Sequence, residues 1–277
     1  MEESGWLTRS NERTVWFYPP GLEATGMVIS GFSTRIGGVS GGPYSSLNQG
    51  LHVGDVTELV LKNRGILAEA AGLPPGSQVV PAQVHGDRVH LAEWSDAGAG
   101  ARDLESSISD CDALITREPG LPLVTHHADC VALLILDPLK KAVGIAHAGW
   151  KGTRLRIGEK TVRAMGEAFG TRPEDCRVAI SPSIGPCCYE VDAPLIEQFT
   201  AAFPYHSELL TPRPGQKAHL DLWEANRRPL IEIGVRDQNV FTSRLCTCCS
   251  PDYFYSYRRE PGGVTGRMAA FIMLRPG

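Results

Sequence analysis

The segment LPLVTHHADCVALLILDPLKKAVGIAHAGWKGT, residues 121–153, decides the fold. It contains two apolar runs, 131–136 and 142–146, that have the length of strands and no helical stripe, so we predict two largely buried strands. Reactive side chains flank the two runs: His126, His127, Asp129, Cys130 and His147. Soft ligands at the ends of rigid strands indicate a functional site. Taken singly, Cys130 is equally consistent with a small buried hydrophobe and His147 with a core histidine.

Length and composition bound the class of protein. The chain has 277 residues, of which 42% are hydrophobic and 21% charged, as expected for an enzyme-sized globule. We therefore expect a single domain over residues 1–277, with its core at about 26–275. The net charge of −4 and the pI of about 6.1 favour neither nucleic acid nor an anionic membrane surface as a partner. No apolar run approaches the roughly 18 residues of a membrane span.

The amino-terminal segment MEESGWLTRSNERTVW, residues 1–16, lacks the basic and apolar regions of a signal peptide. We therefore expect a cytoplasmic protein. Its eight cysteines are then reduced thiols, to be considered for metal binding or catalysis before disulfides.

Apolar patterning and turn residues divide the rest of the chain into short elements. We predict strands at 14–17, 26–32, 79–84, 89–94, 110–116, 178–180, 239–242 and 268–274. We predict helices at 58–71, 155–169, 193–203 and 222–233, the first with Thr57 as its N-cap. Segments 79–84 and 89–94 are expected to pair as a hairpin. Strands outnumber helices without strict alternation, which predicts an α/β (α+β) layered sandwich of mixed sheets with flanking helices.

Two polar loops near the amino terminus are candidates for substrate binding. Residues 33–44, STRIGGVSGGPY, contain four glycines whose backbone N–H groups can approach an anion, and Arg35 can clamp one. The next loop, NQGLHVGD at 48–55, contributes Asn48 and His52. The alternative is that both are ordinary surface loops, because the first has no P-loop lysine.

Three residues match the donor set of a catalytic metal. A catalytic zinc takes three protein ligands and leaves a fourth position for water or substrate, and His85, Cys130 and His147 can form such a set. Zinc lowers the pKa of bound water toward ~7. Spacing alone leaves open that the three residues never meet, because no CxxC or HExxH pair links them. The chemical rival is a Cys130 nucleophile with His147 as its base. His126 and His127 face opposite ways on a strand, so at most one points into a given site.

The remaining cysteine-rich segments give a weaker signal. They contain Cys187, Cys188, Cys246, Cys248 and Cys249. CC and CxCC are not zinc-ribbon spacings, and buried thiols explain these residues about as well as a second metal cluster does.

Several motifs occur in a family-specific order along the chain. They are FSTRIGGVSGGPYSSLNQGLHVGD at 32–55, QVHG at 83–86, HADC at 127–130, AHAGWKGT at 146–153, SPSIGPCCYEV at 181–191 and the tail CTCC…YSYRRE…GRMAAFIML. With these motifs, the chain from about residue 32 to residue 274 resembles the YfiH/laccase-domain family, once called multicopper polyphenol oxidases and also known as peptidoglycan editing factors.

The resemblance implies a fold, a metal site and an activity. The fold would be an α/β sandwich of the cysteine hydrolase-like kind, and the zinc ligands would be His85, Cys130 and His147. The substrates would be purine nucleosides and phosphate: phosphorolysis of adenosine, inosine, guanosine and methylthioadenosine, and hydrolytic deamination of adenosine. We expect a monomer or weak homodimer. Copper is not expected, because eight scattered histidines without an HxH pair are too few for a multicopper oxidase.

Roles beyond the metal ligands stay open. Arg35, Arg64 and Arg258 are candidates for holding phosphate, although exposed arginines mostly serve as solvated or structural charges. The chain lacks the HxE and PCxxC signature of the zinc base deaminases, so the acid for deamination is unassigned, with Asp129 and Glu190 as candidates. The alternative functions are an amidase or cysteine hydrolase editing peptidoglycan precursors, a polyphenol oxidase, and a non-catalytic nucleotide sensor.

Overall fold

A six-stranded mixed sheet carries the two apolar runs of the central segment. The computed structural model describes residues 5–276, so the first four residues of the predicted domain and of the amino-terminal segment, with residue 277, lie outside it. The strand order is β13 (Val240–Thr242), β9 (Arg177–Ile180), β7 (Val131–Asp137), β8 (Ala142–Ala148), β5 (Ala113–Thr116) and β4 (Val89–Leu91). The inner pairs are antiparallel, whereas β13–β9 and β4–β5 are parallel.

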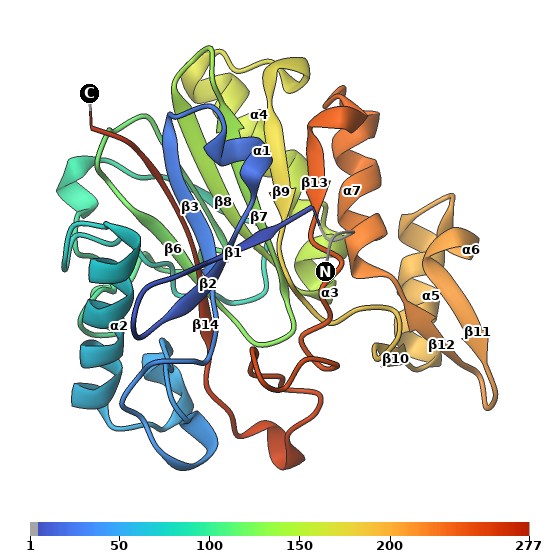
Figure 1. Ribbon diagram of the computed structural model, residues 1–277. Coiled ribbons are helices and arrows are strands. Elements are labelled where there is room, and N and C mark those ends of the chain that lie inside the picture. Colours follow the sequence, from blue (N-terminus) through green and yellow to red (C-terminus); the bar gives the residue numbers. More distant parts are fainter. Residues whose placement is uncertain (1–4, 277) are drawn as a thin grey trace.

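A five-stranded antiparallel sheet packs against the first (Figure 1). Its order is β1 (Leu7–Ser10), β2 (Val15–Tyr18), β3 (Val28–Ser33), β14 (Met268–Leu274) and β6 (Leu123–His127). Strand β14 shows how the two faces are used. Met268, Ala270 and Ile272 pack toward the six-stranded sheet, whereas Ala269 and Phe271 face the opposite way. Both faces of β14 are therefore buried, which explains its continuous apolar sequence.

Helices cover the outer faces of the two sheets, giving a layered sandwich (Figure 1). Helix α2 (Thr57–Ala71) lies over the five-stranded sheet through Leu67 and Ala68. Helices α4 (Ile157–Phe169) and α7 (Leu222–Glu232) cover the six-stranded sheet, and α3 (Trp150–Arg154) follows β8 directly. No helix among residues 5–276 has the length and apolar character needed to cross a membrane.

A third, smaller sheet lies at one side of the sandwich (Figure 1). It has the order β10 (Glu190–Val191), β12 (Lys217–Leu220) and β11 (Leu210–Arg213), beside α5 (Ala193–Ala202) and α6 (His206–Leu209). The other helical turns are short: α1 (Pro20–Glu23) and the 3-10 turns Gly42–Tyr44, Leu51–Val53, Trp94–Asp96, Pro173–Asp175, Asp237–Asn239 and Pro261–Gly263.

The predicted fold class is confirmed, but two local predictions are wrong and one helix begins later than predicted. Segments 79–84 and 89–94 form no hairpin: Val79 and Pro81 make only isolated bridges, and β4 pairs in parallel with β5. Proline has no N–H for a continuous ladder, and the neighbouring N–H groups bond to several different loops. The helix predicted at 155–169 is present as α4, which begins two residues later, at Ile157, because Arg156 at φ 58 separates it from α3. Val56 rather than Thr57 is the N-cap of α2.

Candidate active site

Two adjacent strands and one loop bring His85, Cys130 and His147 together. Cys130 immediately precedes β7, and His147 lies in β8 opposite Ala132, so the antiparallel register places the thiol beside the imidazole. His85 reaches them from the loop before β4. One ligand atom of each residue lies within 4.8 Å of the others. The structure thus assembles the predicted donor set, which we call the His–Cys–His group.

Asp112 holds two members of this group in place. Its Oδ1 accepts a hydrogen bond from Nδ1 of His147 at 2.8 Å, which leaves Nε2 of His147 to face Cys130. The same carboxylate accepts the backbone N–H groups of Val84, His85 and Gly86 at 2.7–3.1 Å. Asp112 is fully buried. One carboxylate therefore fixes the ring orientation of His147 and the loop that carries His85.

The backbone around the group is strained and closely packed. His85 has φ 60 and Asp129 has φ 86, conformations that residues with a side chain adopt rarely and that concentrate at functional sites. A Cβ atom at Gly149 would lie 2.9 Å from Sγ of Cys130 and 3.0 Å from Cδ2 of His85. Glycine at this position therefore leaves the space that the thiol and imidazole occupy.

The charges of the group are coupled. Burial raises the pKa of the Cys130 thiol, but the charge and hydrogen bond of His147 and the hydrogen bond of His85 outweigh it and lower that pKa to about 6. Burial lowers the pKa of His147, but the charge of Cys130 and the hydrogen bond to Asp112 outweigh it and raise that pKa to about 9. Without metal, the favoured state near neutral pH is a thiolate beside an imidazolium, and a thiolate is the form that binds metal.

The His–Cys–His group opens into a cavity of about 780 Å³, a size typical of small-molecule sites. Three aromatic side chains line it: Trp150, Tyr189 and Tyr257. Apolar side chains such as Ile184 and Leu222 add to the wall. The cavity thus combines a reactive group with flat apolar surface.

A basic cluster lines another part of the cavity wall. It consists of Arg64, Arg267, His52 and His126. No ion pair is formed by either arginine within residues 5–276. Burial lowers the pKa of Arg64 to about 10. Burial, with the charges of Arg267 and Arg64, lowers the pKa of His52 to about 4. These side chains would gain from an anion beside them.

The predicted substrate-binding residues divide into two sets. His52, Arg64 and Arg258 line the cavity. Asn48 does not line it, but its Oδ1 accepts the backbone N–H of Arg267 at 2.8 Å and so helps to position the basic cluster. Arg35 lies outside the lining.

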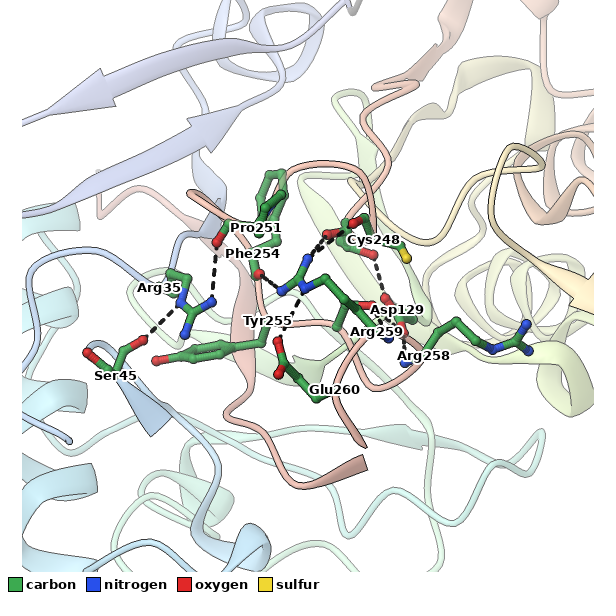
Figure 2. A network of polar contacts seen from close by, with 12 residues as sticks. Arg35, Ser45, Asp129, Cys248, Pro251, Phe254, Tyr255, Arg258, Arg259 and Glu260 are labelled. Carbon is green, nitrogen blue, oxygen red and sulfur yellow. Dashed lines mark hydrogen bonds and ion pairs between the residues drawn. The ribbon is translucent and has the colours of Figure 1, made fainter. Parts of the chain in front are cut away.

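Arg35 joins the glycine-rich loop to the carboxy-terminal loop, the segment 243–267 between β13 and β14 (Figure 2). Its guanidinium donates hydrogen bonds to the backbone carbonyls of Ser45 and Pro251 at 2.9 and 3.2 Å, and it lies over the ring of Tyr255. The glycine-rich loop that contains it therefore packs on the protein's own chain.

Asp129 ties the carboxy-terminal loop to the cavity (Figure 2). Its carboxylate accepts hydrogen bonds from Oγ1 of Thr247 at 2.6 Å, Oγ of Ser256 at 3.0 Å and the backbone N–H of Arg258 at 2.7 Å. Because its carboxylate accepts all three hydrogen bonds, Asp129 holds the carboxy-terminal loop in place and is not a free acid in the cavity. The other candidate acid, Glu190, pairs with Lys217 and is not part of the lining.

The family assignment follows from a comparison with known proteins. A family model described as "Multi-copper polyphenol oxidoreductase laccase" matches residues 29–275. The chain belongs to this family.

Within this laccase-type family, the chain is similar to characterised enzymes. It is 42% identical over 246 residues to "Purine nucleoside phosphorylase YlmD" of Geobacillus stearothermophilus, covering 88% of this chain and 89% of the relative. It is 34% identical over 233 residues to "Adenosine deaminase RL5" of an unknown prokaryotic organism, covering 83% and 88%. The crystal structure of the Geobacillus protein superposes with a TM-score of 0.92 at 38% identity, covering 98% of this chain and all of that one. The protein is therefore an enzyme.

The described residues do not provide the copper ligands that the name of the laccase-type family implies. A multicopper oxidase needs a blue-copper centre and a cluster of further coppers held largely by histidine. Among residues 5–276, the His–Cys–His group is the only set of clustered donors that contains imidazole. No methionine, the usual axial ligand of blue copper, lines the cavity in the described part of the chain.

Two further site residues, Asp112 and Arg267, were not predicted from the sequence. Asp112 is the aspartate directly before β5, and an acid at a strand end was its only signal. Arg267 precedes β14 in the motif GRMAAFIML and went unassigned. For the adjacent pair of histidines, His126 lines the cavity, whereas His127 packs against Phe32 and His147.

Proposed function

We propose that the protein is a zinc-dependent purine nucleoside enzyme. It phosphorolyses adenosine, inosine, guanosine and methylthioadenosine to the free base and ribose 1-phosphate, and it hydrolytically deaminates adenosine to inosine. The observation that carries the proposal is that the His–Cys–His group shares one cavity with two arginines that form no ion pair within residues 5–276. The relatives named purine nucleoside phosphorylase and adenosine deaminase support it.

The donor set fits zinc. Two imidazoles and one thiolate leave a fourth tetrahedral position free, as in catalytic zinc sites. The Asp112–His147 hydrogen bond is the carboxylate–histidine arrangement that orients zinc-binding histidines. When bound, zinc supplies a Lewis acid and lowers the pKa of a bound water. His85, Cys130 and His147 would hold it.

The basic cluster is the proposed phosphate site. Arg64 is fixed by donating to the carbonyls of Gln49, Gly100 and Ala101 at 2.7–3.0 Å, so its charge is held in position at the wall. Arg267 provides the second positive charge. In phosphorolysis a phosphate oxygen forms a bond to C1′ of the ribose, and the bond from C1′ to the base nitrogen breaks. Fixed positive charges hold and orient the attacking anion without reorganisation.

The aromatic wall is the proposed site for the base. Trp150 and Tyr189 line the cavity, and the ring of Tyr189 lies under the guanidinium of Arg258, with 5.1 Å between the guanidinium carbon and the ring centroid. A purine can stack on such rings, with a gain of ~1–3 kcal/mol per base. Stacking depends little on the identity of the base, which suits an enzyme that accepts adenosine, inosine and guanosine.

A product assay tests the proposal. Zinc-quantified protein is incubated with adenosine, with and without phosphate, and adenine, inosine and hypoxanthine are separated by chromatography. We expect adenine only with phosphate and inosine without it, both lost in His85→Ala. No product from zinc-loaded, folded protein would show that the proposed function is wrong.

A second candidate is a thiol hydrolase acting on amides of peptidoglycan precursors. The observation in its favour is the Asp112–His147–Cys130 chain, which has the order of a catalytic triad with Cys130 as nucleophile. A chelator separates the two chemistries: it abolishes a zinc-dependent reaction, and it leaves or increases activity that depends on the free thiol.

We also propose a cytoplasmic location. All eight cysteines are free, including two exposed ones, and free thiols persist in a reducing compartment.

A further inference from the structure

Four thiols from two distant loops meet outside the cavity. Cys187 and Cys188 belong to the loop after β9, and Cys246 and Cys249 to the loop after β13. Their four Sγ atoms all lie within 4.8 Å of one another. Cys187 and Cys249 are exposed, so burial as small apolar residues does not account for the cluster.

The sulfur separations suit one metal ion. Sγ of Cys249 lies 3.4 Å from Sγ of Cys187 and 3.3 Å from Sγ of Cys188. Zinc–sulfur bonds of about 2.3 Å in a tetrahedron place the sulfurs about 3.8 Å apart, within the range that this cluster spans. A disulfide needs a sulfur separation of about 2.05 Å, and all four thiols are free.

The two loops are held in register by the backbone. Ser183 donates its N–H to the carbonyl of Leu245, and Thr247 donates its N–H to the carbonyl of Ser183. The backbone N–H of Gly185 points at Sγ of Cys246 at 3.2 Å, the kind of donor that stabilises a thiolate. A Cβ at Gly185 would lie 3.3 Å from Sγ of Cys187. The thiols are therefore presented by a pre-formed pair of loops.

We propose that Cys187, Cys188, Cys246 and Cys249 bind a second zinc ion in a closed, structural site. Four thiolates fill the tetrahedral shell and leave no position for substrate, in contrast to the His–Cys–His group. The CC and CxCC spacings do not indicate this site, because each loop contributes two ligands and the fold joins the loops.

The proposed site secures one wall of the cavity. Thr247, between the ligands Cys246 and Cys249, donates the hydrogen bond to Asp129. Arg259 donates to the carbonyls of Thr247 and Cys248 (Figure 2), and Tyr189, which lines the cavity, follows Cys188 directly. A metal ion here would fix the loops on which Asp129 and the aromatic wall depend.

Metal analysis of the full chain tests the proposal. Zinc per chain is measured by mass spectrometry for the wild type, His85→Ala, Cys249→Ser and Cys248→Ser, the last being a neighbouring thiol outside the cluster. Cobalt substitution of His85→Ala adds a spectroscopic readout of thiolate ligation. We expect about one zinc for each of the two groups in the wild type, one fewer in Cys249→Ser and no loss in Cys248→Ser. Intense sulfur-to-cobalt bands should persist in His85→Ala and vanish when Cys249→Ser is added.

Alkylation of the native protein provides a test that needs no cysteine variant. Cys187 and Cys249 are exposed, so without metal an alkylating reagent can reach both, whereas zinc should protect both until a chelator removes it. Folded His85→Ala protein without zinc, equal zinc in Cys249→Ser and wild type, or iron in place of zinc would each overturn the proposal. The His85→Ala results do not depend on nucleoside turnover, so they stand even if the proposed function fails.

Discussion

Replacing Asp112 by asparagine tests how the His–Cys–His group is held. Oδ1 of Asp112 accepts from His147 and from the backbone of His85, and Oδ2 accepts from the backbones of Val84 and Gly86. An asparagine keeps the shape but puts an NH2 group where one oxygen was. In either orientation of the amide, the NH2 group faces two N–H groups and cannot accept a hydrogen bond from them, because an amide NH2 only donates.

The size of the effect follows from these contacts. Each buried N–H group left without an acceptor costs about 1–3 kcal/mol, so Asp112→Asn should lower the free energy of unfolding by about 2–6 kcal/mol. If the amide NH2 faces His147, it favours the neutral ring form that has its proton on Nε2, the atom that faces Cys130. Loss of a carboxylate behind a metal-binding histidine typically weakens metal binding about 10–100-fold. We therefore expect Asp112→Asn to weaken zinc binding by about 10–100-fold.

Two measurements and one matched control decide the outcome. Zinc affinity is measured by competition with a chromogenic chelator, and stability by urea unfolding. Asp87→Asn is the control, because Asp87 lies in the same loop but its only ion pair among the described residues is an exposed one with Lys160, worth less than about 1 kcal/mol. If Asp112→Asn behaved like Asp87→Asn in both measurements, the positioning role of Asp112 would be refuted.

Three further predictions address the cavity. Gly149→Ala should abolish turnover and weaken zinc binding, because the added methyl group enters the His–Cys–His group. Gly65→Ala is the control: this helical position has open space around it, so the change should raise the free energy of unfolding by about 0.5–1 kcal/mol. Turnover and thermal unfolding are measured for both variants. Arg267→Gln should raise the KM for phosphate by about 10–100-fold with deamination retained, and Arg35→Gln should not; equal phosphate kinetics in the two variants would contradict the assignment of the basic cluster. Chelation should remove both nucleoside activities, and zinc alone should restore them; full activity in demonstrably metal-free protein would favour the thiol mechanism.

The fold class was predictable because burial leaves a local pattern. The strands at 131–136, 142–146 and 268–274 are apolar on both faces, which reflects their position between layers. β6 was not predicted, because Thr125, His126 and His127 interrupt its apolar pattern although all of its residues are buried. The hairpin predicted for 79–84 and 89–94 is wrong because apolar composition indicates burial but does not identify the strand that a segment pairs with. One backbone partner of segment 79–84, the carbonyl of Pro122, lies more than forty residues away along the chain, and no local sequence pattern predicts such a contact.

The candidate site was predictable where reactive residues sit at strand ends. Cys130 directly precedes β7 and His147 lies in the adjacent β8, so their approach follows from one antiparallel pairing. Asp112, Arg267 and the four-cysteine cluster depend on contacts between distant segments. Their residue types are common, and only the fold shows which of them meet.

The two halves of the proposed chemistry belong to different layers of the sandwich. Cys130 and His147 are carried by the six-stranded sheet, whereas His126 lies in β6 of the five-stranded sheet and Arg64 in the helix that covers it. The tight turn at 128–130, with Asp129 at φ 86, passes directly from β6 to β7 and so joins the two layers at the cavity. The distance between the metal ligands and the basic cluster is therefore set by the packing between the sheets, which is fully buried and resists change.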